Sequence, residues 1–337
     1  MARRDRTTGL PRPRGRTNRD VSDHDGGWFP PKDEHLRYAI LGGVTLLLVL
    51  VLGVFVYRWY DNNFQRPGKT ILSAGEESFS LGYYSDRLGP FLISNPGTSS
   101  SIGPQLLLAK LEEEALTLQL ATDLGIEITE DDITAAIAAD LGVPVGSGSG
   151  SAFDNAYRLR LSGTGLSDGN YRRLTKASEA DRLLREYVRN EIGETGETVQ
   201  IRLVLVDTQE SADEIVDRVN QGEDMGTIAQ VESIHVQSRV EDGLLISPPS
   251  LLSDEAQEVL KDLEVGKLSA PFEDDDGFWV IRLERRDPEG TFTDQHLEEL
   301  VILRFEEMIA KARSATEIER NLSPGDIDWA LERIHIA

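Results

Sequence analysis

The chain has 337 residues, enough for about two domains of ordinary size. Its formal net charge of −24 argues against nucleic-acid binding, because such a protein needs a basic face to displace counterions from phosphates. The absence of cysteine excludes disulfides, a thiol nucleophile and Cys-ligated zinc.

The N-terminal arm, residues 1–37, differs in charge from everything that follows it. It holds nine Lys or Arg against six Asp or Glu, a net charge of +3, which leaves −27 for the rest of the chain. Large apolar residues are almost missing before Trp28. Because such a segment cannot bury enough apolar surface to fold, we expect a disordered arm.

An uncharged run of twenty residues, Tyr38 to Tyr57, follows the arm. At 1.5 Å per residue it spans the roughly 30 Å hydrocarbon core of a bilayer, so we predict a transmembrane helix over 38–60. A cleaved signal peptide would be followed by small residues, whereas Arg58 and Trp59 are bulky. The basic arm predicts a single-pass protein of the cell membrane, with a cytoplasmic N-terminus and extracytoplasmic main domains.

Residues 70–195 carry a helical pattern. Gly103 to Gly125 has leucines and alanines at three- and four-residue spacing and ends on glycine. Ser80 can cap an earlier helix, and Thr129 with Asp132 has the spacing of a capping box. We therefore predict a helical domain over this range.

Residues 199–287 have a different pattern: strand, helix, helix, irregular segment, helix and strand. The last strand is predicted to end at Pro288. The acidic run Glu273 to Gly277 lacks the alternating ligand spacing of a calcium loop, so we interpret it as a hairpin turn. One further amphipathic helix is predicted over 293–322, packing back on the helical domain, with a tail at 323–337.

The order of these segments resembles the extracytoplasmic folding factors of the SurA, PpiD and PrsA type. The segments "LLLAKLEEEALTLQLATDLGIEITEDDI" and "GLSDGNYRRLTKASEADRLLRE" are similar to their helical region, and "VGKLSAPFEDDDGFWVIRL" to their parvulin-type peptidyl-prolyl isomerase domain. The resemblance implies an α+β fold: one transmembrane helix, then a SurA-like helical chaperone domain over 70–195, interrupted by a parvulin-like domain over 199–287.

Carrying the family's catalytic positions over suggests that the isomerase site is not intact. Its two histidines fall at Leu203 and Trp279, and its acidic residue falls at Asp242 or the neighbouring Glu241. Leucine has no polar side-chain group and tryptophan offers one N–H donor, so the family's hydrogen-bonded cluster cannot form from these residues.

The family's apolar substrate groove is expected at Leu252 and Ala256, together with Leu203 and Trp279. His235 lies in the same segment, but a single histidine on a loop is more often a solvated surface residue. No metal or cofactor is expected, because none of the histidines has the spacing of a metal site or a catalytic triad.

Three functions remain open. The first is a membrane-anchored folding factor that binds unfolded or partly folded exported polypeptides, with isomerase activity weak or lost. The second is a structural or docking subunit of a membrane or secretion complex, with a secretion-machinery partner. The third is an active prolyl isomerase with an atypical site.

Overall fold

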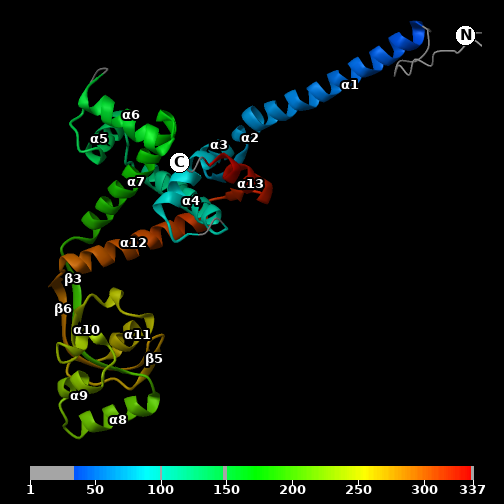
Figure 1. Cartoon of the computed structure of the whole chain (residues 1–337). Helices are drawn as coiled ribbons and strands as arrows, with labels where there is room; N and C mark the ends of the chain where they lie inside the picture. The colour runs from blue at the N-terminus through cyan, green and yellow to red at the C-terminus, as the bar shows by residue number, and fades with distance from the viewer. Residues whose placement is uncertain (1–33, 99–100, 147–149, 335–337) are drawn as a thin grey trace, which may run out of the picture. The chain divides into compact units, whose positions relative to one another are not determined.

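A computed structural model describes residues 34–98, 101–146 and 150–334 of the protein. The arm expected at residues 1–37 lies, as far as residue 33, outside the described residues. The chain divides into two compact units, residues 1–62 and 63–337. Figure 1 labels the elements along the chain.

The first unit contains the apolar helix α1, Glu34–Tyr60. Among the described residues, it provides the one helical segment that is long and apolar enough to cross a membrane. Its valine and leucine side chains are exposed all around the helix. A helix that is apolar on every side has the composition of a membrane span.

In the second unit, a helical region surrounds a small antiparallel sheet of order β2-β1-β7. Its elements are α2 (Arg66–Gly68), β1 (Thr70–Ala74), β2 (Glu77–Ser80), α3 (Leu81–Ser94), α4 (Gly103–Asp123), α5 (Glu130–Asp140), α6 (Ala152–Thr164), α7 (Asp168–Ile192), α12 (Asp294–Ala315), β7 (Ile318–Arg320) and α13 (Pro324–Arg333). Ser80 caps α3 by accepting from the backbone N–H of Tyr83, and Thr129 with Asp132 forms a capping box on α5. These local signals act as the sequence predicts.

Helix α4 is the centre of the helical region, since it contacts α3, α7 and α12. One side packs with α3, β1 and α13 around Leu107 and Leu111. The other packs with α7 and α12, where Leu116 meets Leu184 and Phe305. In Figure 1, α12 lies beside α4 although nearly 200 residues separate them in the sequence. The helical region is therefore assembled from both ends of the second unit.

The C-terminal part differs from the expectation of one helix over 293–322 and a tail. Helix α12 ends at Ala315, where Thr316 adopts an extended conformation. The chain then forms β7, which pairs antiparallel with β1, and the helix α13, which contacts α3. Helix α13 begins with a capping box of Ser323 and Asp326, and Trp329 packs in the core beside α3. Residues 323–334 thus belong to the folded region.

Between α7 and α12 the chain forms an α+β unit with a four-stranded antiparallel sheet of order β4-β3-β6-β5. Its elements are β3 (Thr195–Val206), α8 (Gln209–Asn220), α9 (Met225–Glu232), α10 (Val236–Arg239), β4 (Leu244–Ser247), η2 (Pro249–Leu251), α11 (Asp254–Asp262), β5 (Phe272–Asp274) and β6 (Gly277–Thr291). Helices α8 and α9 pack on one face around Val204 and Val280, and α11 packs on the other around Leu203 and Ile281. The α+β fold predicted from the sequence is confirmed.

Strands β3 and β6 form a long ladder that connects this unit to α7 and α12. The ladder runs from Val206 paired with Phe278 to Thr195 paired with Thr291. Strand β6 continues past Pro288, contrary to the prediction, because the register shifts there: Thr198 pairs with Asp287 and Gly196 with Gly290. At such a bulge a proline is tolerated, since no ladder hydrogen bond is required of it.

Candidate functional site

Leu203 and Trp279 lie on the same face of the sheet. Leu203 pairs with Ile281 across the ladder, and Trp279 pairs with Leu205 two residues further along β3. Side chains two residues apart along a strand share a face, so Leu203 and Trp279 are diagonal neighbours. Both belong to the apolar core that α11 covers.

This core is closed at the positions expected to form a substrate groove. Leu203 is 0% and Ala256 is 1% exposed, so neither side chain contacts solvent. Leu252 is half-buried and packs on the same cluster. Of the expected groove residues, only Leu252 offers substantial surface to a ligand. Leu203 on β3 and Ala256 on α11 are ordinary core residues, since their side chains pack inside the domain.

Asp242 does not join Leu203 and Trp279. Its carboxylate accepts a hydrogen bond from Gln230 of α9, and its backbone carbonyl accepts one from Arg202. Arg202 is adjacent to Leu203 in β3, so its side chain points to the opposite face of the sheet. Asp242 also has a φ of 55°, which belongs to a turn residue leading into β4. The structure therefore holds this carboxylate in a turn rather than at the apolar site.

His235, by contrast, lies beside Trp279, with 5.6 Å between the ring centroids. It is half-buried rather than a solvated surface residue. Its Nδ1 accepts the backbone N–H of Ser238 at 3.2 Å, which makes His235 the cap of α10. Burial lowers the pKa of His235, and the nearby Asp276 opposes this only partly, so the imidazole is neutral at pH 7.

Trp279 is surrounded by aromatic rings and carries an unused donor. The Phe272 ring stacks on it at 6.4 Å, on the side of β5, and His235 approaches at a tilt. The indole is 8% exposed, and its Nε1 has no hydrogen-bond partner among the described residues. Residues 195–291 contain one histidine, His235, so a pair of imidazoles from this part of the chain cannot form around Leu203 and Trp279.

A groove on the helical region offers a different kind of surface. It has a volume of about 530 Å³ and lies where α7 and α12 meet the end of α4 and η2 of the α+β unit. Most of its lining residues are apolar and three are charged. The groove is lined by Leu124, Tyr187, Val188, Glu191, Ile192, Ser250, Leu300, Leu303, Arg304, Glu307 and Met308. We call it the α7–α12 groove. Val188 is buried, Leu124 is exposed, and the other apolar side chains of the lining are partly buried, so the groove presents apolar surface to solvent.

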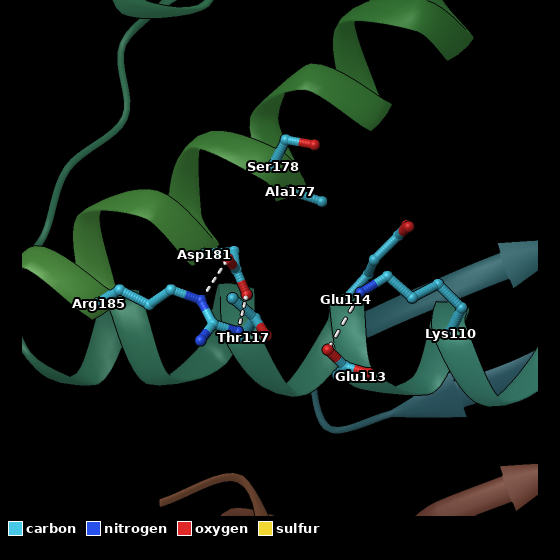
Figure 2. Close-up of a pocket in the computed structure, with 8 residues that line it drawn as sticks. All are labelled: Lys110, Glu113, Glu114, Thr117, Ala177, Ser178, Asp181 and Arg185. Carbon is cyan, nitrogen blue, oxygen red and sulfur yellow. Dashed lines mark hydrogen bonds and ion pairs between the residues drawn. The ribbon is translucent and has the colours of Figure 1, made fainter. Parts of the chain in front are cut away.

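A second cavity, between α4 and α7, is polar (Figure 2). The charged residues that line it are already paired. Lys110 binds Glu113 at 3.0 Å and Arg185 binds Asp181 at 2.8 Å, as the dashed lines show. Glu114 forms a buried ion pair with Arg87. Because these charges are satisfied within the protein, the cavity offers no unpaired charged side chain to a ligand.

Comparison with known proteins identifies the α+β unit. Residues 203–285 match the Rotamase family, described as a PPIC-type PPIASE domain. The chain contains a parvulin-type rotamase domain. This confirms the family resemblance seen in the sequence. Among curated proteins, none matches the chain.

Several solved structures are similar to the chain. PrsA from Bacillus cereus is 17% identical, covering 80% of this chain and 99% of that one with a TM-score of 0.39. A structure reported for the SurA-like chaperones PEB4 and Cj1289 of Campylobacter jejuni is 19% identical, covering 71% and 91% with a TM-score of 0.27. The parvulin domain of PpiD from E. coli is 21% identical, covering 28% and 93% with a TM-score of 0.26.

The sequence did not reveal which polar residue of the rotamase domain lies nearest to Trp279. His235 is brought there by the segment between α9 and β4, which Ser233 anchors by accepting the backbone N–H groups of Leu205 and His235. No local pattern pointed to this position, because histidine is not among the residues that commonly cap a helix.

Proposed function

We propose that this protein is a membrane-anchored, extracytoplasmic folding factor that binds unfolded or partly folded exported polypeptides. The α7–α12 groove is the binding surface for these polypeptides. The rotamase domain has weak or no isomerase activity and forms one wall of the groove through η2. The main domains follow α1 on the outer side of the cell membrane, and the basic arm stays in the cytoplasm.

The observation that carries this proposal is the composition of the α7–α12 groove. Seven apolar residues line it, and an extended polypeptide can place one or two apolar side chains in a groove of this volume. Binding of this kind requires apolar surface and no proton transfer. It therefore suits a protein that holds many unrelated chains rather than one that modifies a single substrate.

The rotamase site supports the loss of catalysis. Isomerisation must pass a barrier of roughly 18–20 kcal/mol, and an enzyme lowers it by favouring the twisted amide over the planar one. Leu203 is sealed in the core, and Trp279 meets the aromatic rings of Phe272 and His235. Such residues supply no paired imidazoles to act on a twisted amide.

Two neighbouring residues of α12 allow a matched test. Leu303 lines the α7–α12 groove, whereas Ile302 is 42% exposed and lies outside the groove. The full-length protein in nanodiscs should slow the aggregation of chemically denatured citrate synthase. We expect Leu303→Glu to abolish this effect and Ile302→Glu to leave it unchanged. Equal loss in both variants, or in neither, would contradict the assignment of the groove.

A docking function is the second candidate, because the rotamase domain has an exposed apolar strip. Val231, Val236 and Val240 are 75%, 69% and 74% exposed on α9, on α10 and just after α10. A subunit of a secretion complex would use such a strip for one partner. Crosslinking from Val236 in intact cells tests this: a single stoichiometric partner favours docking, and a range of exported proteins favours the folding factor.

A further inference from the structure

The indole of Trp279 is an unusual feature of the rotamase domain. Its Nε1–H is the one buried side-chain polar atom without a hydrogen-bond partner among the described residues. Native proteins rarely leave a buried donor unpaired, and an exception calls for a functional explanation. Neither the fold nor the groove described above uses this N–H.

Neither of the two rings in contact with Trp279 accepts the indole N–H. Ser233 already accepts two backbone N–H groups. Nδ1 of His235 accepts the backbone N–H of Ser238, so the neutral imidazole carries its proton on Nε2 and presents a second donor. Phe272 has no polar atom. The two rings in contact with the indole therefore offer one donor and apolar surface but no acceptor, which a bound ligand can supply.

We propose that Nε1–H of Trp279 donates a hydrogen bond to a main-chain carbonyl oxygen of a bound polypeptide. This inference rests on the proposed function, since it takes an unfolded polypeptide as the ligand. An extended polypeptide has both carbonyl acceptors and apolar side chains. The carbonyl suits the indole N–H, and the apolar side chains suit the neighbouring rings of Phe272 and His235. The contact is independent of sequence, because every residue has a carbonyl.

Access to the indole requires a ring to move, because Nε1 is covered in this structure. His235 is the ring that can move. It lies at the start of α10, a helix of four residues, and Val236 and Val240 on either side of the turn are exposed rather than packed. Moving the ring breaks the hydrogen bonds of the His235 imidazole with Ser238, a local change within a helix of four residues. The polypeptide thus replaces His235 over the indole.

The same hydrogen bond would hold a prolyl peptide without speeding its isomerisation. The C–N bond of an amide owes its barrier to resonance, which places negative charge on the carbonyl oxygen. A donor at that oxygen stabilises the charge and increases the double-bond character of the C–N bond. Trp279 therefore favours the planar amide, whereas catalysis requires the twisted one. The residue is a binding residue rather than a catalytic one.

The test measures binding of a fluorescein-labelled apolar heptapeptide with one central proline to the full-length protein in detergent micelles. Trp279→Phe keeps an aromatic ring and removes the donor, and should weaken binding about fivefold, the usual value of one hydrogen bond. Trp329→Phe removes part of a buried indole in the helical region and should leave the affinity unchanged. If Trp279→Phe does not fold, 3-benzothienylalanine at position 279 keeps the shape and replaces the N–H with sulfur.

A peptide series identifies the acceptor. When each amide of the heptapeptide is replaced in turn by an ester, the carbonyl becomes a weaker acceptor. One ester peptide should bind the wild-type protein more weakly than the parent peptide does. With the Trp279→Phe variant, the same ester and the parent peptide should bind equally well. If the wild type binds the heptapeptide and Trp279→Phe binds it equally well, the inference is wrong and the folding-factor function stands. If the wild type binds none of the peptides, both are wrong.

Discussion

Glu112 connects three parts of the helical region, and its two partners should show strongly non-additive effects on stability. The carboxylate lies on α4 and is 6% exposed. One oxygen accepts from Arg313 of α12 at 3.0 Å, and the other accepts from Arg320 of β7 at 2.8 Å. Both arginine side chains are about half exposed, at 48% and 52%.

Removing one arginine leaves the other on the buried carboxylate. Because each arginine is half solvated, we expect Arg313→Ala or Arg320→Ala alone to lower the free energy of unfolding by about 1 kcal/mol. The double variant leaves Glu112 buried without a counter-charge, which costs about 3–5 kcal/mol. Adding Glu112→Leu to the double variant should restore stability to within roughly 1 kcal/mol of the wild type, since an apolar residue needs no partner.

Urea unfolding of the full-length protein, followed by circular dichroism, measures all four variants. In a thermal melt each kcal/mol corresponds to roughly 2–4 °C for a large domain, so the double variant should melt about 6–20 °C below the wild type. Helix α12 also lines the α7–α12 groove, so the double variant should suppress aggregation poorly. A double-variant loss equal to the sum of the two single losses would refute the reasoning, because Glu112 would then not depend on its last partner.

Three further predictions concern the rotamase domain and the membrane. In a protease-coupled proline peptide assay we expect little or no turnover from the wild type. We expect none from the double variant Leu203→His, Trp279→His, because side chain 203 is buried. Robust turnover by the wild type would contradict the loss of isomerase activity. The pKa of His235 is lowered by burial, so the stability it contributes is complete above about pH 6.5 and is lost as the pH falls through its folded pKa. His235→Gln should therefore show a smaller loss of melting temperature between pH 7.5 and 5.5 than the wild type, and equal losses would show that His235 does not control it. External protease should degrade residues 61–337 in cells with permeable walls and spare a short anchored fragment, whereas protection of the whole chain would contradict the topology.

Local signals made most helices and the α+β unit predictable. The capping box at Thr129 and Asp132 and the periodic leucines of α4 act over three or four residues, so a single sequence carries the whole signal. Helix α13 had such a signal as well, in the capping box of Ser323 and Asp326. Only ten residues long, α13 shows too few turns for its apolar period to stand out in the sequence.

Contacts between distant segments were not predictable from pattern alone. The pairing of β7 with β1 joins strands from the two ends of the helical region, and each strand is too short to show a period. In the rotamase domain the sequence could indicate that Leu203 and Trp279 share a sheet face. It could not indicate that Leu203 is sealed or that His235 approaches the indole, because both depend on the path of the segment between α9 and α11.

The rotamase domain is inserted between α7 and α12 through the paired strands β3 and β6. The backbone N–H of Phe292 donates to the carbonyl of Glu194 at 2.9 Å, so the chain leaves α7 and returns to α12 at almost the same point in space. A linker of about four residues, at roughly 3.3 Å each, could replace the whole domain without moving either helix. Loss or exchange of catalytic residues inside the domain would then leave the fold of α7 and α12 unchanged, and only the part of the groove that Ser250 lines would depend on the domain.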